Sequence, residues 1–108
     1  MRYEVLLTEG AERDVAEIYR YISETDSRDR ADRWLERLLR AATALTEVAE
    51  RGAYPKELLA LGIRDYRQVL VGSYRVIYRV RDERVFIYLV ADNRRDMQAL
   101  LQRRLLGA

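Results

Sequence analysis

The sequence contains no cysteine and no histidine among its 108 residues. Without cysteine there is no disulfide framework and no thiolate metal site. Without histidine, the commonest zinc ligand and the commonest general base are both missing. We therefore expect neither a metal nor a cofactor, and most familiar catalytic constellations are excluded.

Long apolar runs are also missing, because no stretch approaches the roughly 18 residues that a membrane-spanning helix needs. The chain opens with Met1, Arg2, Tyr3 and Glu4, which does not resemble the basic start of a signal peptide. We expect a cytoplasmic protein that has no contact with a membrane.

The composition fits one small folded domain. Domains typically span about 100 to 150 residues, so residues 1–108 are expected to form a single domain. Apolar residues make up 49% of the chain, and the 35% that are charged are interleaved with them. This mixture is typical of a globular protein rather than a disordered one.

Charge is distributed unevenly along the chain. Residues 1–50 contain 8 basic and 12 acidic residues, a net charge of −4, whereas residues 51–108 contain 12 basic and 6 acidic residues, a net charge of +6. Nearly all the basic residues are arginine, whose guanidinium group binds phosphates and carboxylates with two parallel hydrogen bonds. The basic half suits such a partner, although an ordinary solvated surface would have the same composition.

The N-terminal half predicts one strand and two helices. Tyr3, Val5 and Leu7 alternate as in a short strand ending at Thr8, which can cap a helix from Glu9 to about Glu24. Residues 25–27 offer further caps for a second amphipathic helix that continues to about Glu50. Because few residues join the two helices, we expect an antiparallel hairpin whose apolar side covers another layer.

The C-terminal half predicts strands. Residues 51–65 contain the only proline and form a connecting loop, with a turn of helix at residues 57–61. Three strand-like runs follow, separated by the two-residue turns Gly72-Ser73 and Asp82-Glu83 and covering residues 66–71, 74–80 and 84–91. The third run is continuously apolar, so we expect a central strand that is covered on both faces.

A final helix is expected through Met97 and Leu105, with Asp92 or Asn93 as its cap. The predicted fold class is therefore α+β. It consists of an N-terminal strand, an antiparallel helical hairpin packed on an antiparallel sheet with a three-stranded meander, and a short C-terminal helix.

The middle strand of the meander carries arginines on one side. Val76, Tyr78 and Val80 share one face, and the opposite face, with Arg75, Ile77 and Arg79, is expected to be open and basic. Alternatively, the arginines pair across strands with acids such as Asp82.

The order of elements is similar to that of the RelE/ParE toxin superfamily over essentially the whole chain. Residues 74–80, YRVIYRV, and residues 92–96, DNRRD, resemble the family's YRVIYRV and V-x-D-x-RRD signatures. Residues 7–14 with residues 18–22 resemble the first strand and helix of ParE-like members. The resemblance implies the toxin component of a type II toxin–antitoxin system, which causes growth arrest and contributes to plasmid stabilisation.

The superfamily has two main activities. Its RelE-like members are ribosome-dependent mRNA endoribonucleases. By resemblance Arg67 and Arg75 would hold the scissile phosphate, and Arg94 or Arg95 would stabilise the charge of the transition state. However, Val69 occupies the place of a second lysine, and Leu100 occupies that of the tyrosine that transfers a proton. Leucine cannot do so, and the possible substitutes are tyrosines of the strands, namely Tyr66, Tyr74 and Tyr88. The carboxylates of Asp92 and Asp96 could also act, although their simpler role is to cap the last helix.

We therefore favour the ParE-like activity, inhibition of DNA gyrase and hence of replication, in which the protein binds its target and is not an enzyme. A degenerate member that only binds its antitoxin is a third possibility. The candidate target-binding residues are those of the sheet face, Arg67, Arg75 and Arg79, and those of the terminal helix, Arg94, Arg95, Arg103 and Arg104.

The resemblance also implies a cognate ParD-like or RelB-like antitoxin, through which the pair would contact DNA indirectly. Its disordered, acidic C-terminal segment would fold on the toxin, against the apolar side of the helical hairpin or an exposed sheet edge. Tyr19, Trp34 and Leu38 are the candidate contacts, and packing in the core is the alternative role of each.

Overall fold

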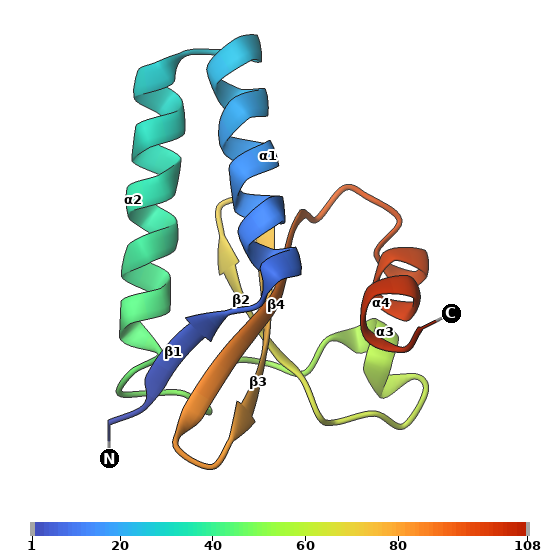
Figure 1. Cartoon of the computed structure of the whole chain (residues 1–108). Helices are drawn as coiled ribbons and strands as arrows, with labels where there is room; N and C mark the ends of the chain where they lie inside the picture. Colours follow the sequence, from blue (N-terminus) through green and yellow to red (C-terminus); the bar gives the residue numbers. More distant parts are fainter. Residues whose placement is uncertain (1, 108) are drawn as a thin grey trace.

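A computed structural model describes residues 2–107, and it places one mixed sheet between two pairs of helices (Figure 1). The strands are β1 (Glu4–Leu7), β2 (Arg67–Val71), β3 (Tyr74–Arg81) and β4 (Arg84–Asp92). The helices are α1 (Glu9–Thr25), α2 (Arg28–Ala44), α3 (Lys56–Leu59) and α4 (Met97–Leu105). The predicted α+β fold class is thus confirmed, as are the helical hairpin and the meander.

The strand order is β1-β4-β3-β2, and β1 pairs with β4 in parallel. The prediction of a purely antiparallel sheet was therefore wrong at this one pairing. The reason is topological: the hairpin of α1 and α2 returns the chain to the end of the sheet at which β1 began. Hence β2 and, after the meander, β4 run in the same direction as β1.

The predicted beginnings of both long helices are confirmed. The side chain of Thr8 accepts a hydrogen bond from the Ala11 amide at 3.2 Å, and that of Ser27 accepts one from the Arg30 amide at 3.1 Å. These bonds satisfy amides that have no partner within the helix.

The end of α2 was predicted about six residues too late, at Glu50 instead of Ala44. Beyond Ala44 the chain forms successive turns with bonds between residues three apart, and the carbonyl of Thr46 accepts from the Tyr3 amide at 2.7 Å. Leu45 and Ala49 are buried in these turns, so the apolar stripe continues although the helix does not.

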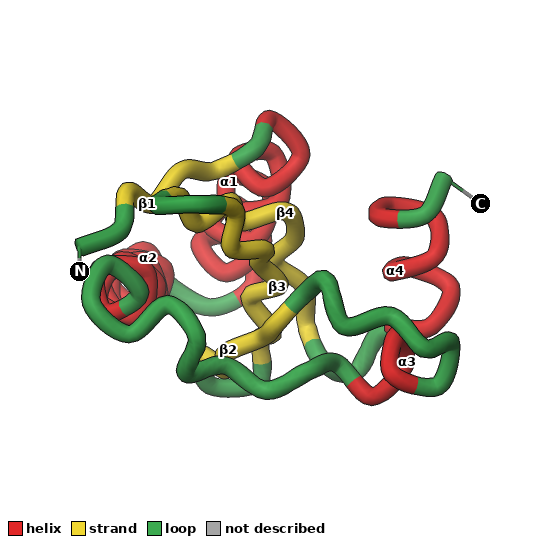
Figure 2. The backbone as a smooth tube through the Cα atoms, turned by 90° about the horizontal axis from the view of Figure 1, so that it is seen from below, coloured by secondary structure: helices red, strands yellow, loops and turns green. Residues whose placement is uncertain are grey.

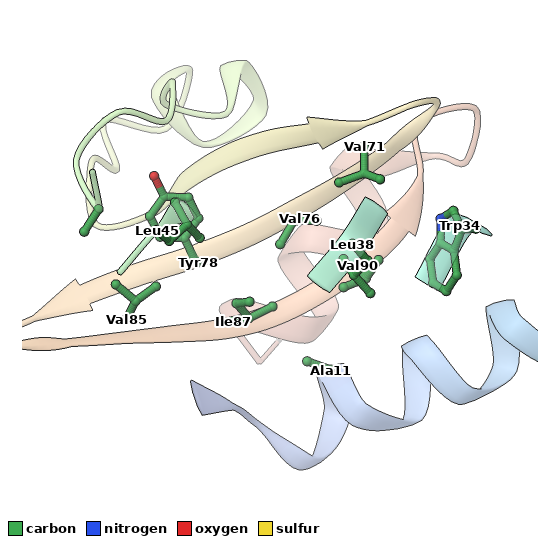
Figure 3. Close-up of a cluster of buried hydrophobic side chains, with 11 residues drawn as sticks. Ala11, Trp34, Leu38, Leu45, Val71, Val76, Tyr78, Val85, Ile87 and Val90 are labelled. Carbon is green, nitrogen blue, oxygen red and sulfur yellow. The ribbon is translucent and has the colours of Figure 1, made fainter. Parts of the chain in front are cut away.

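The first of two hydrophobic clusters lies between the hairpin of α1 and α2 and one face of the sheet. It contains Trp34 and Leu38 of α2 together with the strand residues Val76 and Val90, and Leu38 lies next to Val90 in Figure 3. The alternation predicted for β3 is confirmed here, since Val76 and Tyr78 are buried on this face.

The second cluster covers the opposite face with α3 and α4, which lie on the other side of the sheet from α1 and α2 (Figure 2). It contains Leu58, Ile77, Leu89 and Leu101. Because successive side chains of β4 point to opposite faces, this strand supplies both clusters. A β-bulge at Tyr88, where Ile77 pairs with Leu89 and Tyr78 with Ile87, turns Val90 toward the first cluster and Leu89 toward the second. This explains why residues 85–91 are apolar without a break.

Candidate functional site

Arg75 lies on the sheet face under α3, and only 6% of it is exposed. Its guanidinium donates from Nη1 and Nη2 to the two carboxylate oxygens of Glu57, at 2.7 and 3.0 Å. Its Nε donates to Oδ1 of Asn93 at 2.6 Å, and Nη1 donates to Oε1 of Gln68 at 3.3 Å. The hydrogen bond from Arg75 holds the pKa of Glu57 below its ordinary value, so the carboxylate is ionised and neutralises the arginine.

The prediction of an open and basic sheet face was therefore wrong. Arg75 and Ile77 are both buried there, because α3 and α4 pack on this face and α3 brings Glu57 to Arg75. The alternative, that the arginines pair with acids, is confirmed in kind, but the acids come from the segment that contains α3 and not from Asp82. Sequence reasoning missed Glu57, since it is 18 residues from Arg75 and no spacing rule connects them.

Arg67 and Arg79 contact the same connecting segment from opposite faces of the sheet, because Arg67 pairs with Tyr78 of the first cluster and Arg79 lies on the face of Arg75. Arg67 donates to the Gly52 carbonyl at 2.9 Å and to the Tyr54 hydroxyl at 3.1 Å. Arg79 is 3.4 Å from Asp65, and its guanidinium lies over the ring of Tyr66 at 5.7 Å. The structure thus places Arg75 and Arg79 on one face and Arg67 on the other, so the prediction of one face with all three arginines was wrong, and each of them is engaged within the fold.

Arginines of the terminal segment are more exposed. The side chain of Arg94 is 82% exposed although it forms an ion pair with Asp92 at 2.6 Å, and its hydrogen bonds hold the pKa of Asp92 below the ordinary value. Arg95 and Arg103 are exposed as well, and no carboxylate within residues 2–107 forms an ion pair with them.

The cap of α4 is Asp96, whose carboxylate accepts from the Ala99 amide at 3.2 Å. The prediction of Asp92 or Asn93 was wrong, because Asp92 ends β4 and binds Arg94, while Asn93 accepts from Arg75. The loop that precedes α4 is therefore longer than expected, and it displays Arg94 and Arg95 between the sheet and the helix.

Arg104 belongs to a separate, partly buried contact between α4 and α1. Its Nη1 and Nη2 donate to the two oxygens of Asp14 at 2.9 and 3.0 Å, and Nη2 also donates to the Tyr88 carbonyl at 3.2 Å. Asp14 in turn accepts from the Val90 amide at 3.0 Å. The guanidinium lies against Gly10, where a Cβ atom would be 2.7 Å from Nη2. The side chains of Arg104 and Asp14 thus provide hydrogen-bond partners for the main chain at the edge of β4.

The residues considered for proton transfer, Leu100 and the strand tyrosines, do not lie together at one site. Leu100 is buried in the second cluster, and Tyr66 packs edge-on against Tyr88 with ring centroids 5.6 Å apart. Tyr74 lies on the opposite face against Trp34. Burial and then the charge of Asp92 raise the pKa of Tyr74 above its ordinary value, which keeps its hydroxyl protonated.

A cavity of about 330 Å³ lies at the end of β4, between α1 and the loop that precedes α4. Tyr21, Tyr74 and Arg95 face it, and 63% of Tyr21 is exposed. Sequence reasoning did not find Tyr21, because an aromatic residue on a helix is usually expected in the core.

Two of the three predicted antitoxin contacts are unavailable to a partner. Trp34 and Leu38 are buried in the first cluster, because the apolar side of the hairpin faces the sheet. Tyr19 is half-buried, donates to a carboxylate oxygen of Asp32, and lines a shallow groove with Val15 and Leu35.

A second apolar cleft, of about 420 Å³, lies between the end of α2 and β2. Exposed Val48 and Leu70 line it, and Arg51 contributes a positive charge. The Ala53 bridge to Gln68 occupies one position of this sheet edge.

The part of the chain from residue 2 to 107 contains no group of three or more potential metal-binding side chains. Within the same residues, no helix has the length and apolar character required to cross a bilayer.

Comparisons with known proteins identify relatives of this fold. The family model for the ParE toxin of the type II toxin–antitoxin system parDE matches residues 5–97. Among solved structures, a chain of the chromosomal ParDE TA system from P. aeruginosa superposes with a TM-score of 0.70. It is 16% identical, and the alignment covers 84% of this chain and 96% of that one, which is a likeness of fold. No individual curated protein matches the sequence.

Proposed function

The chain belongs to the ParE toxin family of type II toxin–antitoxin systems, and on that premise we propose that it inhibits DNA gyrase and so blocks replication. In this proposal it acts by binding: it stabilises the complex in which gyrase has cut DNA. It is neutralised by a cognate ParD-like antitoxin.

The observation that carries this proposal is the buried ion pair of Arg75 and Glu57. An endonuclease of the RelE-like kind needs a free cation next to the scissile phosphate. Here the corresponding guanidinium is neutralised by a carboxylate at 2.7 Å and covered by α3. Leu100 is buried, and Tyr74, with its raised pKa, lies on the other face of the sheet. These positions favour a binding role over RNA cleavage.

The proposed target surface consists of the exposed arginines at the C-terminal end, Arg94, Arg95 and Arg103. Interfaces are enriched in arginine, and Arg95 and Arg103, which form no ion pair within residues 2–107, can bind acidic protein surfaces or DNA phosphates without first breaking one. Arg94 is exposed beside them although it is paired with Asp92. The other predicted target residues, Arg67, Arg75, Arg79 and Arg104, have structural partners. Their contribution to the target surface is therefore indirect.

For the antitoxin, we propose the cleft between α2 and β2. Val48 and Leu70 offer exposed apolar surface there, and Arg51 suits an acidic segment. Substitution Leu70→Glu should weaken antitoxin binding at least about tenfold, because it puts a charge into an apolar contact. Calorimetric titration with the purified antitoxin measures the change in affinity. The variant Tyr19→Ala, measured in the same way, tests whether the antitoxin binds instead to the groove lined by Tyr19.

The gyrase proposal is tested with purified protein, gyrase, ATP and plasmid, by scoring cut DNA after detergent and protease treatment. Linear DNA should accumulate with the dose of toxin. The double variant Arg95→Ala/Arg103→Ala should need at least about tenfold more protein, because each lost charged hydrogen bond costs about 1.5 to 3 kcal/mol.

The matched control is Arg28→Ala/Arg40→Ala, which removes two exposed arginines from α2 and should leave the dose unchanged. If the unaltered protein produces no linear DNA and instead cuts mRNA on translating ribosomes, the gyrase proposal is wrong.

A further inference from the structure

The outer edge of β4 is only partly covered by its neighbour. β1 pairs with β4 from Arg84 to Ile87, and the Thr8 amide donates to the Ile87 carbonyl at 3.0 Å. At this point the chain turns away into α1, but β4 continues to Asp92. Within residues 2–107, the last five residues of its outer edge therefore have no neighbouring strand.

Two side chains replace the missing strand over the first part of this edge. Arg104 donates to the Tyr88 carbonyl and Asp14 accepts from the Val90 amide, while the two side chains bind each other. Polar main-chain groups that are withdrawn from water need such partners. The edge is closed here by contacts from α1 and α4.

The next two main-chain groups along this edge, the Val90 carbonyl and the Asp92 amide, have no hydrogen-bond partner within residues 2–107. In an antiparallel ladder, the N–H and C=O of one residue point to the same edge, and alternate residues share that direction. The Val90 amide points outward to Asp14, and the Asn93 amide points inward to Ser73 at 2.7 Å. The Val90 carbonyl and the Asp92 amide consequently point outward, and neither has a hydrogen-bond partner within residues 2–107.

These two groups lie at the cavity of about 330 Å³, which is lined by residues of α1 on one side and of the loop before α4 on the other. One donor and one acceptor on an open strand edge are the groups that an added strand uses. Tyr21 and Tyr74 stand beside them with Arg94 and Arg95, and tyrosine and arginine are the residue types enriched where protein partners bind most strongly.

The charges of the cavity restrict the partner further. Asp14 is neutralised by Arg104 and Asp92 by Arg94. The remaining charges are Glu17 on the α1 side and Arg95 on the loop side. A complementary strand therefore has an acidic residue near Arg95 and a neutral or basic one near Glu17.

We propose that this open part of the β4 edge binds one extended segment of the target protein, DNA gyrase, as a short added strand. The proposal rests on the proposed function and specifies where and how the target is recognised. The site is continuous with the exposed arginines at the C-terminal end and lies at the opposite edge of the sheet from the cleft assigned to the antitoxin, because the strand order is β1-β4-β3-β2.

Hydrogen exchange of the Asp92 amide tests the added strand directly. In the free protein this amide has no partner among residues 2–107 and should exchange rapidly. In the complex with the gyrase holoenzyme and plasmid DNA, its exchange should slow at least about tenfold, because a hydrogen bond to a partner carbonyl protects it. The antitoxin alone should not protect it.

The variant Tyr21→Ala/Arg95→Ala removes two walls of the cavity without touching either core cluster. It should need at least about tenfold more protein for half-maximal DNA cleavage. Its matched control is Leu39→Ala/Arg40→Ala, which removes one exposed apolar side chain and one arginine from α2 and should leave that dose unchanged. Thermal unfolding of both variants checks that the fold is intact.

If the unaltered protein and Tyr21→Ala/Arg95→Ala poison gyrase equally and Asp92 stays unprotected, the assignment of this edge is wrong and the gyrase proposal stands. Protection of Asp92 by the antitoxin and not by gyrase also overturns the assignment. If even the unaltered protein leaves gyrase unaffected, both proposals fall together.

Discussion

The two faces of the sheet are covered in different ways. On one face, the long helices α1 and α2 bury an apolar cluster that includes Trp34 and Leu38. On the other, the short α3 and α4 bury a smaller cluster beside the ion pair of Arg75 and Glu57. The first face is held by many small, interchangeable contacts and the second partly by one specific contact, so substitutions should behave differently on the two.

Physical chemistry explains the difference. Apolar burial contributes roughly 25 cal/mol per Å² and depends little on direction, so the stability lost on substitution increases with the apolar area that is removed. A buried ion pair has large opposing terms, since the cost of removing both charges from water nearly cancels their attraction. Loss of one partner should therefore be severe, and replacement of both should be mild.

The largest expected effect follows from breaking that pair. Arg75→Ala leaves the carboxylate of Glu57 buried without its cation, and the free energy of unfolding should fall by about 3 to 5 kcal/mol. Because whole domains have only about 5 to 15 kcal/mol of stability, this loss is a large share of the total. Urea denaturation followed by circular dichroism measures the change.

The double variant Arg75→Met/Glu57→Leu is the control, because it removes both charges and fills the space with apolar atoms. It should recover most of the lost stability. A double variant that is as unstable as Arg75→Ala would contradict the account of this face.

The corresponding change on the first face is Leu38→Ala. It removes a buried side chain from the cluster in Figure 3 and leaves a cavity, which should lower the free energy of unfolding by about 3 kcal/mol. Leu38→Met is the control, since it preserves volume and should cost less than about 1.5 kcal/mol. Equal losses from both variants in urea denaturation would show that this face also depends on one specific shape.

The same contrast explains what could be predicted from the sequence. The first face was predictable, because the helical periodicity of residues 9–44 and the alternation of Val76 and Tyr78 act over a few residues. The second was not, because the partner of Arg75 is Glu57, from a loop whose course no local pattern determines. Tyr21 was missed for a related reason: the cavity that it lines exists only where β1 ends before β4, a property of the assembled sheet.

Acid should affect the second face first. The pKa of Glu57 is lowered from its ordinary value of 4.5, chiefly by the hydrogen bond from Arg75. Its contribution to stability is therefore complete above pH 4.5 and is lost as the pH falls through the lower folded-state value. The free energy of unfolding should decline in that acidic window, and Glu57→Gln should remove this part of the decline. Urea titrations of both proteins between neutral pH and pH 3 test it, and parallel curves would refute it.

The smallest expected effects come from the caps of the two long helices, and they test how independent the contacts of the first face are. Thr8→Ala and Ser27→Ala each remove one side-chain bond to a helix amide and should each cost about 1 kcal/mol. Because the two caps share no partner, their double variant should lose the sum of the single losses, within about 0.5 kcal/mol. Glu57 and Arg75 should show the opposite relation, in which a second substitution restores stability. Double-mutant cycles for both pairs measure this: the losses from the two caps should add, whereas those from Arg75 and Glu57 should not. A strongly non-additive result for the caps would contradict the difference between the two faces.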